Sequence, residues 1–525
     1  MTTITCYGAV GAIGGNKILL EDGDARLFFD FGLDFGLAGH FFNEYLRPRP
    51  SRGLLDLLAL GILPPLEGLY RDDLALPGLW ERFRGNPLYR NMSRGDALPA
   101  DAVLLSHAHL DHNADLSYVR PDIPVYSTRV SAFIARAMQV TGVSTFEREL
   151  SYVSPRAPSE SGELQSDRGS GYQARPCQFL DGGLSAPALD FWQSLPSARK
   201  PLMAACAECA VGSIAGLPFR WWPVDHSIPG AAGFAVRSSA GWIAYTGDLR
   251  FHGKNGGQSR QFARELAQLR PVALLCEGTR PFSEPNPVTE TDVVANSLEL
   301  VGKGSGKLVV ADFGPRNVER LESFVQIAQA SGRQLVILPK DAYLLQAIAL
   351  ADTDHYQTPE RSPAIQLYAD PKAAPRPWER ALRDAWPNQL VTPGDVSRSP
   401  GDYILCFSLW DANDLLDLQG VEGGIYLYSN SKAYDEEQAA DLDRLRNWVR
   451  HMGFTLHGDP DDKNAIPLHS SGHASGTDLV DFVTTVHPEV LIPIHTEQPE
   501  WWDAQLAGTG VRVRKPGLGE AIVFS

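Results

Sequence analysis

The sequence predicts a mixed α/β protein of at least two domains, and three observations lead to this fold class. Its 525 residues exceed the size of one ordinary hydrophobic core. Short apolar segments repeatedly end in His, Asp or Glu, as they do when strands deliver polar side chains to one edge of a sheet. Residues 290–456 show an alternation of strand and helix of their own, which predicts a separate α/β domain.

The first 31 residues predict three strands. Gly8, Gly11 and Gly14 resemble the glycines of a dinucleotide-binding loop, but a second strand follows them where such a loop requires a helix. We therefore expect a hairpin or a close backbone approach. The third strand ends at Asp30, which places a carboxylate at a strand tip. The predicted strands are Ile4–Tyr7, Lys17–Leu20 and Arg26–Phe29.

Two irregular stretches interrupt the α/β pattern, and we interpret both as elaborations. Residues 36–99 hold many Pro, Arg and aromatic residues, and Arg47, Arg49 and Arg52 either contact phosphate or lie on a solvated surface. Residues 154–200 are rich in Ser, Gly, Pro and Arg, which predicts a long loop or a lid.

Four later strands each lead to a candidate site residue. They are 219–224 before His226, 242–245 before Asp248, 272–276 before Glu277 and 490–494 before His495. Helices are predicted at 130–140 and 477–486. In the separate domain, the predicted strands are 307–310, 334–338, 402–406 and 424–428, and the predicted helices are 317–331, 341–351 and 435–452.

The segment Ser106-His-Ala-His-Leu-Asp-His112 places four metal-ligand side chains within six residues. Residues 102–106 predict a buried strand, so His107 and His109 follow it at alternate positions and can point the same way. Imidazole nitrogens and carboxylate oxygens suit zinc or manganese, and this spacing leaves enough ligands for two ions.

Composition excludes several classes of protein. The formal net charge of -16 argues against a polybasic nucleic-acid coat but leaves a local basic groove open. Neither a secretory leader nor an apolar run long enough for a membrane span is present, so we expect a cytoplasmic protein with no membrane association. Six cysteines in a chain of this length do not predict a disulfide framework.

Taken together, these residues resemble the metallo-β-lactamase fold in its β-CASP nuclease branch, and within it ribonuclease J. The matching segments are Asp225-His-Ser-Ile-Pro-Gly230, Thr246-Gly-Asp248, His469-x-Ser-Gly-His-Ala474 and Pro493-Ile-His495. A whole domain separates Asp248 from His495, as the β-CASP insertion does. The resemblance implies an αββα sandwich with an inserted α/β domain. Its expected parts are 1–281, 282–456 and 457–525, with elaborations at about 36–99 and 154–200.

The resemblance also implies a two-metal site, with zinc expected and manganese as the alternative. One ion would be held by His107, His109 and His226, and the other by Asp111, His112 and His495, with Asp248 bridging them. Asp30 and Glu277 are expected to orient ligands, and the expected catalytic residues are Asp111, His473, Glu277 and Asp30. The expected substrate contacts are His469, Ser471, Gly472, His473, Arg316, Asn317 and Arg320.

The implied function is a metal-dependent nuclease of the phosphodiester hydrolase class. The preferred hypothesis is a 5′-to-3′ exonuclease that acts on single-stranded RNA through a bridging hydroxide. DNA stays open as a substrate. The alternative is a metallohydrolase of a small phosphodiester, ester or thioester. Phe407-Ser-Leu-Trp-Asp-Ala-Asn413 departs from the small Gly-rich turn expected there, which puts recognition of the 5′ end in doubt. The sequence stops at Ser525, so we expect no further C-terminal domain; a homodimer stays open.

Overall fold

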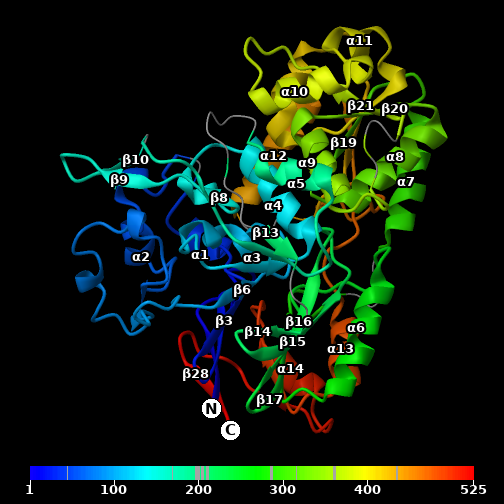
Figure 1. The fold of residues 1–525 in the computed structure, drawn as a ribbon. Coiled ribbons are helices and arrows are strands. Elements are labelled where there is room, and N and C mark those ends of the chain that lie inside the picture. Colours follow the sequence, from blue (N-terminus) through cyan, green and yellow to red (C-terminus); the bar gives the residue numbers. More distant parts are fainter. Residues whose placement is uncertain are drawn as a thin grey trace.

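A computed structural model describes every residue except 44, 168, 196–201, 203–205, 209–211, 284–287, 315, 357, 359–361 and 433–435. Its lower part is a sandwich of two sheets, and a third sheet forms the upper part (Figure 1). Among the helices of the described residues, none combines the length and the apolar character needed to cross a bilayer.

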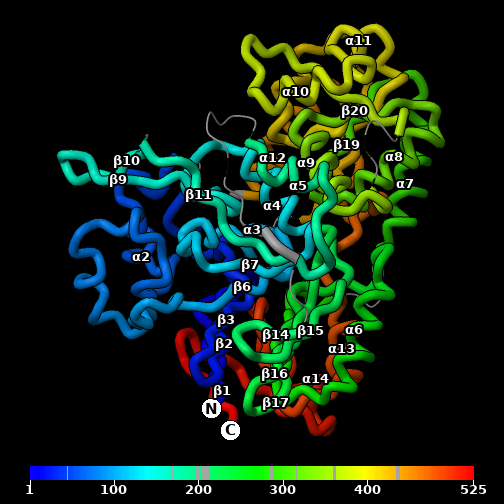
Figure 2. The backbone as a smooth tube through the Cα atoms, in the orientation of Figure 1, coloured from blue at the N-terminus to red at the C-terminus, as the bar shows by residue number. Residues whose placement is uncertain are grey.

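The first sheet of the sandwich has eight strands and joins the two ends of the chain. Its strand order is β13 (Cys206–Glu208), β12 (Cys177–Phe179), β7 (Val125–Ser127), β6 (Ala102–Leu104), β3 (Ala25–Phe29), β2 (Ile18–Asp22), β1 (Thr2–Cys6) and β28 (Ala521–Phe524). The pairing of β1 with β28 brings the termini together at the bottom of Figure 2.

The second sheet faces the first across an apolar layer. Its order is β14 (Ser213–Ile214), β15 (Leu217–Pro223), β16 (Ala232–Ser238), β17 (Gly241–Tyr245), β18 (Ala273–Cys276), β26 (Val490–Pro493) and β27 (Arg512–Val513). Ile4, Phe29 and Leu104 of the first sheet pack against Phe234 and Ile492 of the second. Because β26 pairs with β18, the chain returns to this sheet after the upper part has been completed.

Helices cover the outer face of the second sheet, which completes the sandwich on that side. Phe262 of α6 (Gly256–Leu269) and Phe482 of α13 (Gly476–Val486) pack on β16 to β18 and β26. On the other side, α4 (Arg129–Thr141) lies against the first sheet. Further short helices of this part include α1 (Phe35–Gly39), α2 (Leu55–Ala59), α3 (Leu110–Asn113) and α14 (Trp501–Gln505).

The upper part is a parallel sheet with helices around it, and all of it comes from residues after β18. Its strand order is β22 (Leu390–Val391), β21 (Ile365–Tyr368), β20 (Gln334–Ile337), β23 (Tyr403–Leu405), β19 (Val309–Asp312), β24 (Ile425–Tyr428) and β25 (Thr455–His457). Its helices are α7 (Glu290–Lys303), α8 (Val318–Ser331), α9 (Pro339–Ala351), α10 (Pro377–Ala385), α11 (Pro393–Arg398) and α12 (Glu436–His451). The predicted separate α/β architecture is confirmed.

The glycine-rich segment after β1 forms the predicted hairpin. β1 and β2 are antiparallel, with Thr2 opposite Asp22. Gly14 adopts φ +87°, and a Cβ atom there would lie 2.8 Å from the Cβ of Asp111. Since Asp111 belongs to the candidate metal motif, the expected close approach of the backbone is the approach of this turn to that motif.

The two elaborations, residues 36–99 and 154–200, differ in structure, and the second differs from its prediction. Residues 54–83 bury Leu54, Leu58 and Leu63 against Phe28 of the first sheet. For residues 154–200 the prediction is a long loop or a lid, and the long loop is wrong for the described residues, whereas the lid stays a prediction. They contain the hairpin β9 (Arg156–Pro158) and β10 (Leu164–Ser166), the strands β11 (Gln173–Ala174) and β12, and the helix α5 (Ala186–Gln193). Residues 196–200 lie outside the described residues.

The physical reason for this difference is tertiary burial. Trp192 of α5 is 3% exposed and packs on Phe133 of α4, and Cys177 and Phe179 of β12 are buried in the same core. The sparse apolar residues among many Ser and Gly gave no periodicity, but Cys177, Phe179 and Trp192 are buried in this core.

Candidate metal centre

The polar strand ends converge on one carboxylate, that of Asp248 after β17. Besides His473 Nδ1, which lies 3.9 Å from Oδ2, four imidazoles from three other segments lie within 4 Å of its oxygens. The distances are 3.6 Å from His107 Nε2, 3.3 Å from His112 Nε2, 3.5 Å from His226 Nε2 and 3.9 Å from His495 Nε2. Asp111 Oδ2 lies 3.3 Å from His495 Nε2. Residues 384 positions apart are therefore neighbours.

These side chains divide into groups that fit metal ions. The first is His107, His109, His226 and Asp248, and the second is Asp111, His112 and His495; within each, the candidate ligand atoms lie within 4.8 Å of one another. His112 Nε2 and Asp248 Oδ1 are buried without a hydrogen-bond partner among the described residues. Buried donors and acceptors are normally paired, so this donor set fits cations at this place. The role of each side chain as a ligand stays a prediction.

Asp30 fixes the ring of His112 through its Nδ1 atom. Asp30 Oδ2 lies 2.7 Å from His112 Nδ1 and accepts from Ser106 Oγ at 2.6 Å, and Asp30 Oδ1 accepts from Ser106 N at 2.6 Å. The hydroxyl of Tyr245 donates to the same carboxylate at 2.5 Å. Asp30 is fully buried with φ +55°, a conformation that a non-glycine residue keeps only when its surroundings fix it.

Glu277 and Thr279 hold His495 and His473 in place, as Asp30 does His112. Thr279 Oγ1 donates to Glu277 Oε2 at 2.6 Å and lies 2.9 Å from His495 Nδ1. A hydroxyl that donates to a carboxylate can accept from the ring N–H, which leaves Nε2 of His495 free of the proton. Glu277 Oε2 also lies 3.2 Å from His473 Nδ1.

The electrostatic environment separates the histidines into two kinds. Burial lowers the pKa values of His107 and His226 well below the usual value, and burial and the charge of Arg316 lower the pKa of His109 to about 3. Burial also acts on His473, but the carboxylates of Glu277 and Asp248 outweigh it and raise its pKa to about 9. Lowered pKa values favour the neutral rings that metal ligands require, whereas the raised pKa of His473 favours its protonated form. Burial also acts on His112, but the carboxylates of Asp248, Asp111 and Asp30 outweigh it and raise the pKa of this ring well above the usual value.

Arg316 of the upper part acts on this centre through its charge. It precedes α8, and its charge acts on both His109 and Asp111. Its Nη1 atom is buried without a hydrogen-bond partner among the described residues. A guanidinium with an unsatisfied donor beside a metal centre is suited to a phosphate oxygen.

Three other predicted substrate contacts point elsewhere. The side chain of Asn317 caps α8 by accepting from Arg320 N at 3.0 Å, and His469 Nδ1 lies 3.3 Å from the carbonyl oxygen of Ser429. Arg320 is fully buried; it pairs with Glu290 at 2.7 Å and donates to the carbonyl oxygens of Ser429 and Leu468. These groups brace the segment that carries His473.

The two remaining predicted contacts, Gly472 and Ser471, hydrogen-bond to histidines of the centre, Gly472 through its carbonyl oxygen and Ser471 through its hydroxyl. The carbonyl oxygen of Gly472 lies 2.7 Å from His226 Nδ1, and Ser471 Oγ accepts from His473 N at 3.2 Å. Gly472 also has to be small, because a Cβ atom there would lie 2.6 Å from Ser227 Oγ.

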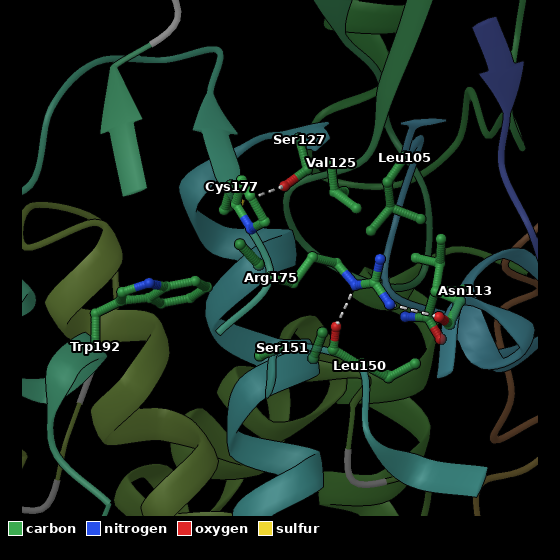
Figure 3. Close-up of a pocket in the computed structure, with 13 residues that line it drawn as sticks. Leu105, Asn113, Val125, Ser127, Leu150, Ser151, Arg175, Cys177 and Trp192 are labelled. Atoms are coloured by element: carbon green, nitrogen blue, oxygen red, sulfur yellow. Dashed lines mark hydrogen bonds between the residues drawn. The ribbon is translucent and has the colours of Figure 1, made fainter. Parts of the chain in front are cut away.

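Two cavities adjoin the centre. The larger, about 260 Å³, opens beside His226 between the lower and upper parts and is lined by Arg250, Gln258, Glu319 and Tyr356 among others. The smaller, about 30 Å³, lies behind the motif and contains Asn113 in its wall (Figure 3). Arg175 extends across it and donates to the carbonyl oxygens of Leu150 and Leu116, so it supports the turn that follows His112.

Sequence reasoning missed Ser106, Tyr245 and Thr279. Ser106 and Thr279 stand one and two positions from a recognised site residue, and that proximity was the signal available. Tyr245 ends a strand that was read as apolar, and only its hydrogen bond to Asp30 across the sandwich identifies its role.

No family model matches the sequence. Over about half of its length the chain is similar to proteins named ribonuclease J. It is 24% identical over 286 residues to that of Corynebacterium glutamicum (53% of this chain, 36% of the relative) and 24% identical over 294 residues to that of Sinorhizobium meliloti (52% and 45%). The chain therefore spans less than half the length of these curated relatives.

A solved structure shows the same fold over the whole chain. A protein of unknown function from Enterococcus faecalis V583 has a TM-score of 0.65 and 22% identity, and the match covers 99% of both chains. The predicted resemblance to ribonuclease J is thus confirmed, and so is the metallo-β-lactamase sandwich with its inserted α/β domain.

Proposed function

We propose that this chain is a metal-dependent phosphodiester hydrolase, a nuclease acting on single-stranded RNA. The observation that carries the proposal is the pair of ligand groups meeting at Asp248, with Arg316 Nη1, which has no hydrogen-bond partner among the described residues, as a candidate phosphate donor. The names of the similar proteins favour RNA, and a ribonuclease J-like 5′-to-3′ exonuclease is the finer form that the sequence resemblance implies. DNA remains the competing substrate.

Two metal ions would bind, one to each of the two ligand groups. Zinc is preferred for its affinity for imidazole, and manganese is the alternative. When bound, they supply Lewis acidity, which lowers the pKa of water and offsets charge on phosphate oxygens. The protein's own contribution is orientation. Asp30 fixes the ring of His112, Thr279 fixes that of His495, and the Gly472 carbonyl fixes that of His226.

Two cationic groups are placed to act on the substrate itself. Arg316 would bind a non-bridging phosphate oxygen through its unpaired Nη1. His473 would hold a proton, because Glu277 lies 3.2 Å from its Nδ1, and would pass one to the departing oxygen. Asp111, His473, Glu277 and Asp30 are thus the side chains that we propose for the chemistry and for the orientation of its groups.

A single assay series tests the proposal. The purified chain with zinc or manganese is given matched RNA and DNA oligonucleotides that bear 5′-hydroxyl, monophosphate or triphosphate ends. We expect cleavage of RNA, and mononucleotide release from one end class would support the exonuclease. If no oligonucleotide is cut, the proposal fails. The 260 Å³ cavity beside His226 would then favour a small phosphodiester, ester or thioester.

Substitution of Asp248 gives the first prediction. Asp248→Asn should reduce both bound metal and cleavage by more than about 100-fold, because one carboxylate lies in contact with both groups. Metal content is measured by mass spectrometry after dialysis. Asp441→Asn, on the surface of α12, serves as the control. An Asp248 variant with full metal content and full activity would contradict the assignment.

A further inference from the structure

We infer that His252 is a positioning residue for the proposed reaction. It fixes the segment 471–474 in place, and with that segment the rings of His226 and His473. The inference rests on the proposed nuclease function. His252 follows the carboxylate of Asp248 by four positions and belongs to neither of the two ligand groups, so its role has to come from what it holds.

The segment that contains His473 is tied at both of its ends to the chain that follows β17. At one end, Ala474 N donates to the carbonyl oxygen of Leu249 at 2.6 Å. At the other end, His252 Nε2 lies 3.0 Å from the carbonyl oxygen of Ser471. A carbonyl oxygen can only accept, so Nε2 of His252 carries the hydrogen of this bond.

The bond from His252 acts on the backbone that serves His226. The carbonyl oxygen of Ser471 belongs to the peptide group that leads into Gly472, and a peptide group is planar, so His252 fixes the orientation of this plane. The carbonyl oxygen of the next peptide group, that of Gly472, accepts from His226 Nδ1 at 2.7 Å and leaves Nε2 of that ring free to bind a metal ion. Because glycine restricts its own φ and ψ least of all residues, contacts from outside have to fix Gly472.

The same bond also determines where His473 lies. Ser471 Oγ accepts from His473 N at 3.2 Å, and Glu277 Oε2 lies 3.2 Å from Nδ1 of the ring. A shift of Ser471 would therefore move His473 relative to the carboxylate that holds its proton. A misplacement of about 1 Å can slow a reaction about 100-fold, so this bond matters for the step that we assign to His473.

The backbone on both sides of His252 is fixed as well. Arg250 N donates to the carbonyl oxygen of Asp225 at 2.8 Å, and Gly253 N donates to the carboxylate of Asp225 at 3.1 Å. The guanidinium of Arg250 pairs with the same carboxylate at 2.8 Å. Because Asp225 directly precedes His226, these contacts form a closed ring that begins and ends at a candidate metal ligand.

Two packed helices carry the segments that His252 joins. Residues 249–252 lead into α6 and residues 471–474 lead into α13, and the two helices lie side by side (Figure 1). The rings of Phe262 in α6 and Phe482 in α13 are 5.5 Å apart. Since this packing holds the helices together, loss of the His252 bond should shift the segment 471–474 locally and leave the fold intact.

The test compares two substitutions of His252 in the full-length chain with zinc. His252→Phe keeps a ring but removes the donor, and it should lower kcat for a single-stranded RNA about tenfold while KM stays nearly unchanged. Its zinc affinity, measured by competition with a chelator, should fall about tenfold as well. His252→Gln places an N–H donor near the position of Nε2 and should restore most of both losses. His451→Phe, at the exposed end of α12, is the control.

The outcomes separate the role of His252 from the nuclease function. If His252→Phe keeps the kcat and the zinc affinity of the wild type, or if His252→Gln loses as much as His252→Phe, the positioning role is refuted and the nuclease function stands. A rise in KM at unchanged kcat would show that His252 contacts the substrate, which also overturns the inference. If the wild type cleaves no RNA, the nuclease function fails, and zinc affinity alone then decides whether His252 orients His226.

Discussion

At the scale of single residues, the centre depends on side chains that never face the substrate. Thr279 is the clearest case, because one hydroxyl serves both Glu277 and His495. Thr279→Val should lower zinc affinity or cleavage by about 10- to 100-fold, and Thr279→Ser should restore both. Zinc content and cleavage rate are measured together. Thr484→Val removes a hydroxyl that bonds only to its own helix and should change neither. A fully active Thr279→Val would show that His495 needs no partner.

A second prediction at this scale concerns Asp341 in α9. Burial raises the pKa of this carboxyl to about 7, and the charge of Lys340 only partly opposes the rise. Since its folded pKa lies above the unfolded value of about 4, its contribution to stability is complete below pH 4 and is lost as the pH rises through 7. Relative to Asp341→Asn, the wild type should therefore lose about 1 kcal/mol per pH unit between pH 4 and 7.

This difference is read from unfolding curves of both proteins over that range. Asp352→Asn, at the end of the same helix, provides the matched control. Parallel stability curves for wild type and Asp341→Asn would mean that Asp341 is solvated.

At the scale of elements, Arg320 ties α7 and α8 to the segment that leads to His473. Its guanidinium pairs with Glu290 of α7 and donates to the carbonyl oxygen of Leu468. Glu290→Gln should cost about 3–5 kcal/mol of stability, because it leaves a buried cation without its partner. Arg320→Lys should also be less stable than the wild type, because an ammonium group cannot replace the forked hydrogen bonds of the guanidinium.

The kinetic signature separates bracing from substrate contact. If Arg320 acts through the position of His473, Arg320→Lys should lower kcat and leave KM for an oligonucleotide nearly unchanged. A large rise in KM with unchanged kcat would instead show that Arg320 contacts the substrate, as the sequence resemblance implied. Lys303→Arg, on the exposed face of α7, is the control.

At the scale of the whole molecule, the inserted domain is joined to the sandwich by an apolar core. Phe133 of α4 and Phe191 of α5 share this core with Tyr343 of α9, whose ring lies 5.5 Å from that of Phe191. We propose that the insertion covers residues 282–456 and unfolds together with the rest. Phe133→Ala should then cost about 3–5 kcal/mol and lower one common transition in calorimetry. Two separate transitions, only one of them shifted, would show independent domains.

The sequence by itself determined the fold class, including an inserted α/β part, and the strand ends that carry the candidate ligands. These features are local: a strand that ends in His107 or Asp248 is recognisable from its own neighbours. Only the tertiary structure decided that Arg320 braces instead of facing the centre, that Thr279 serves His495, and that residues 154–195 fold into strands and a helix. Hydrogen bonds and burial between segments up to 384 positions apart set these outcomes. No periodicity within one segment encodes which distant partner its side chains will meet.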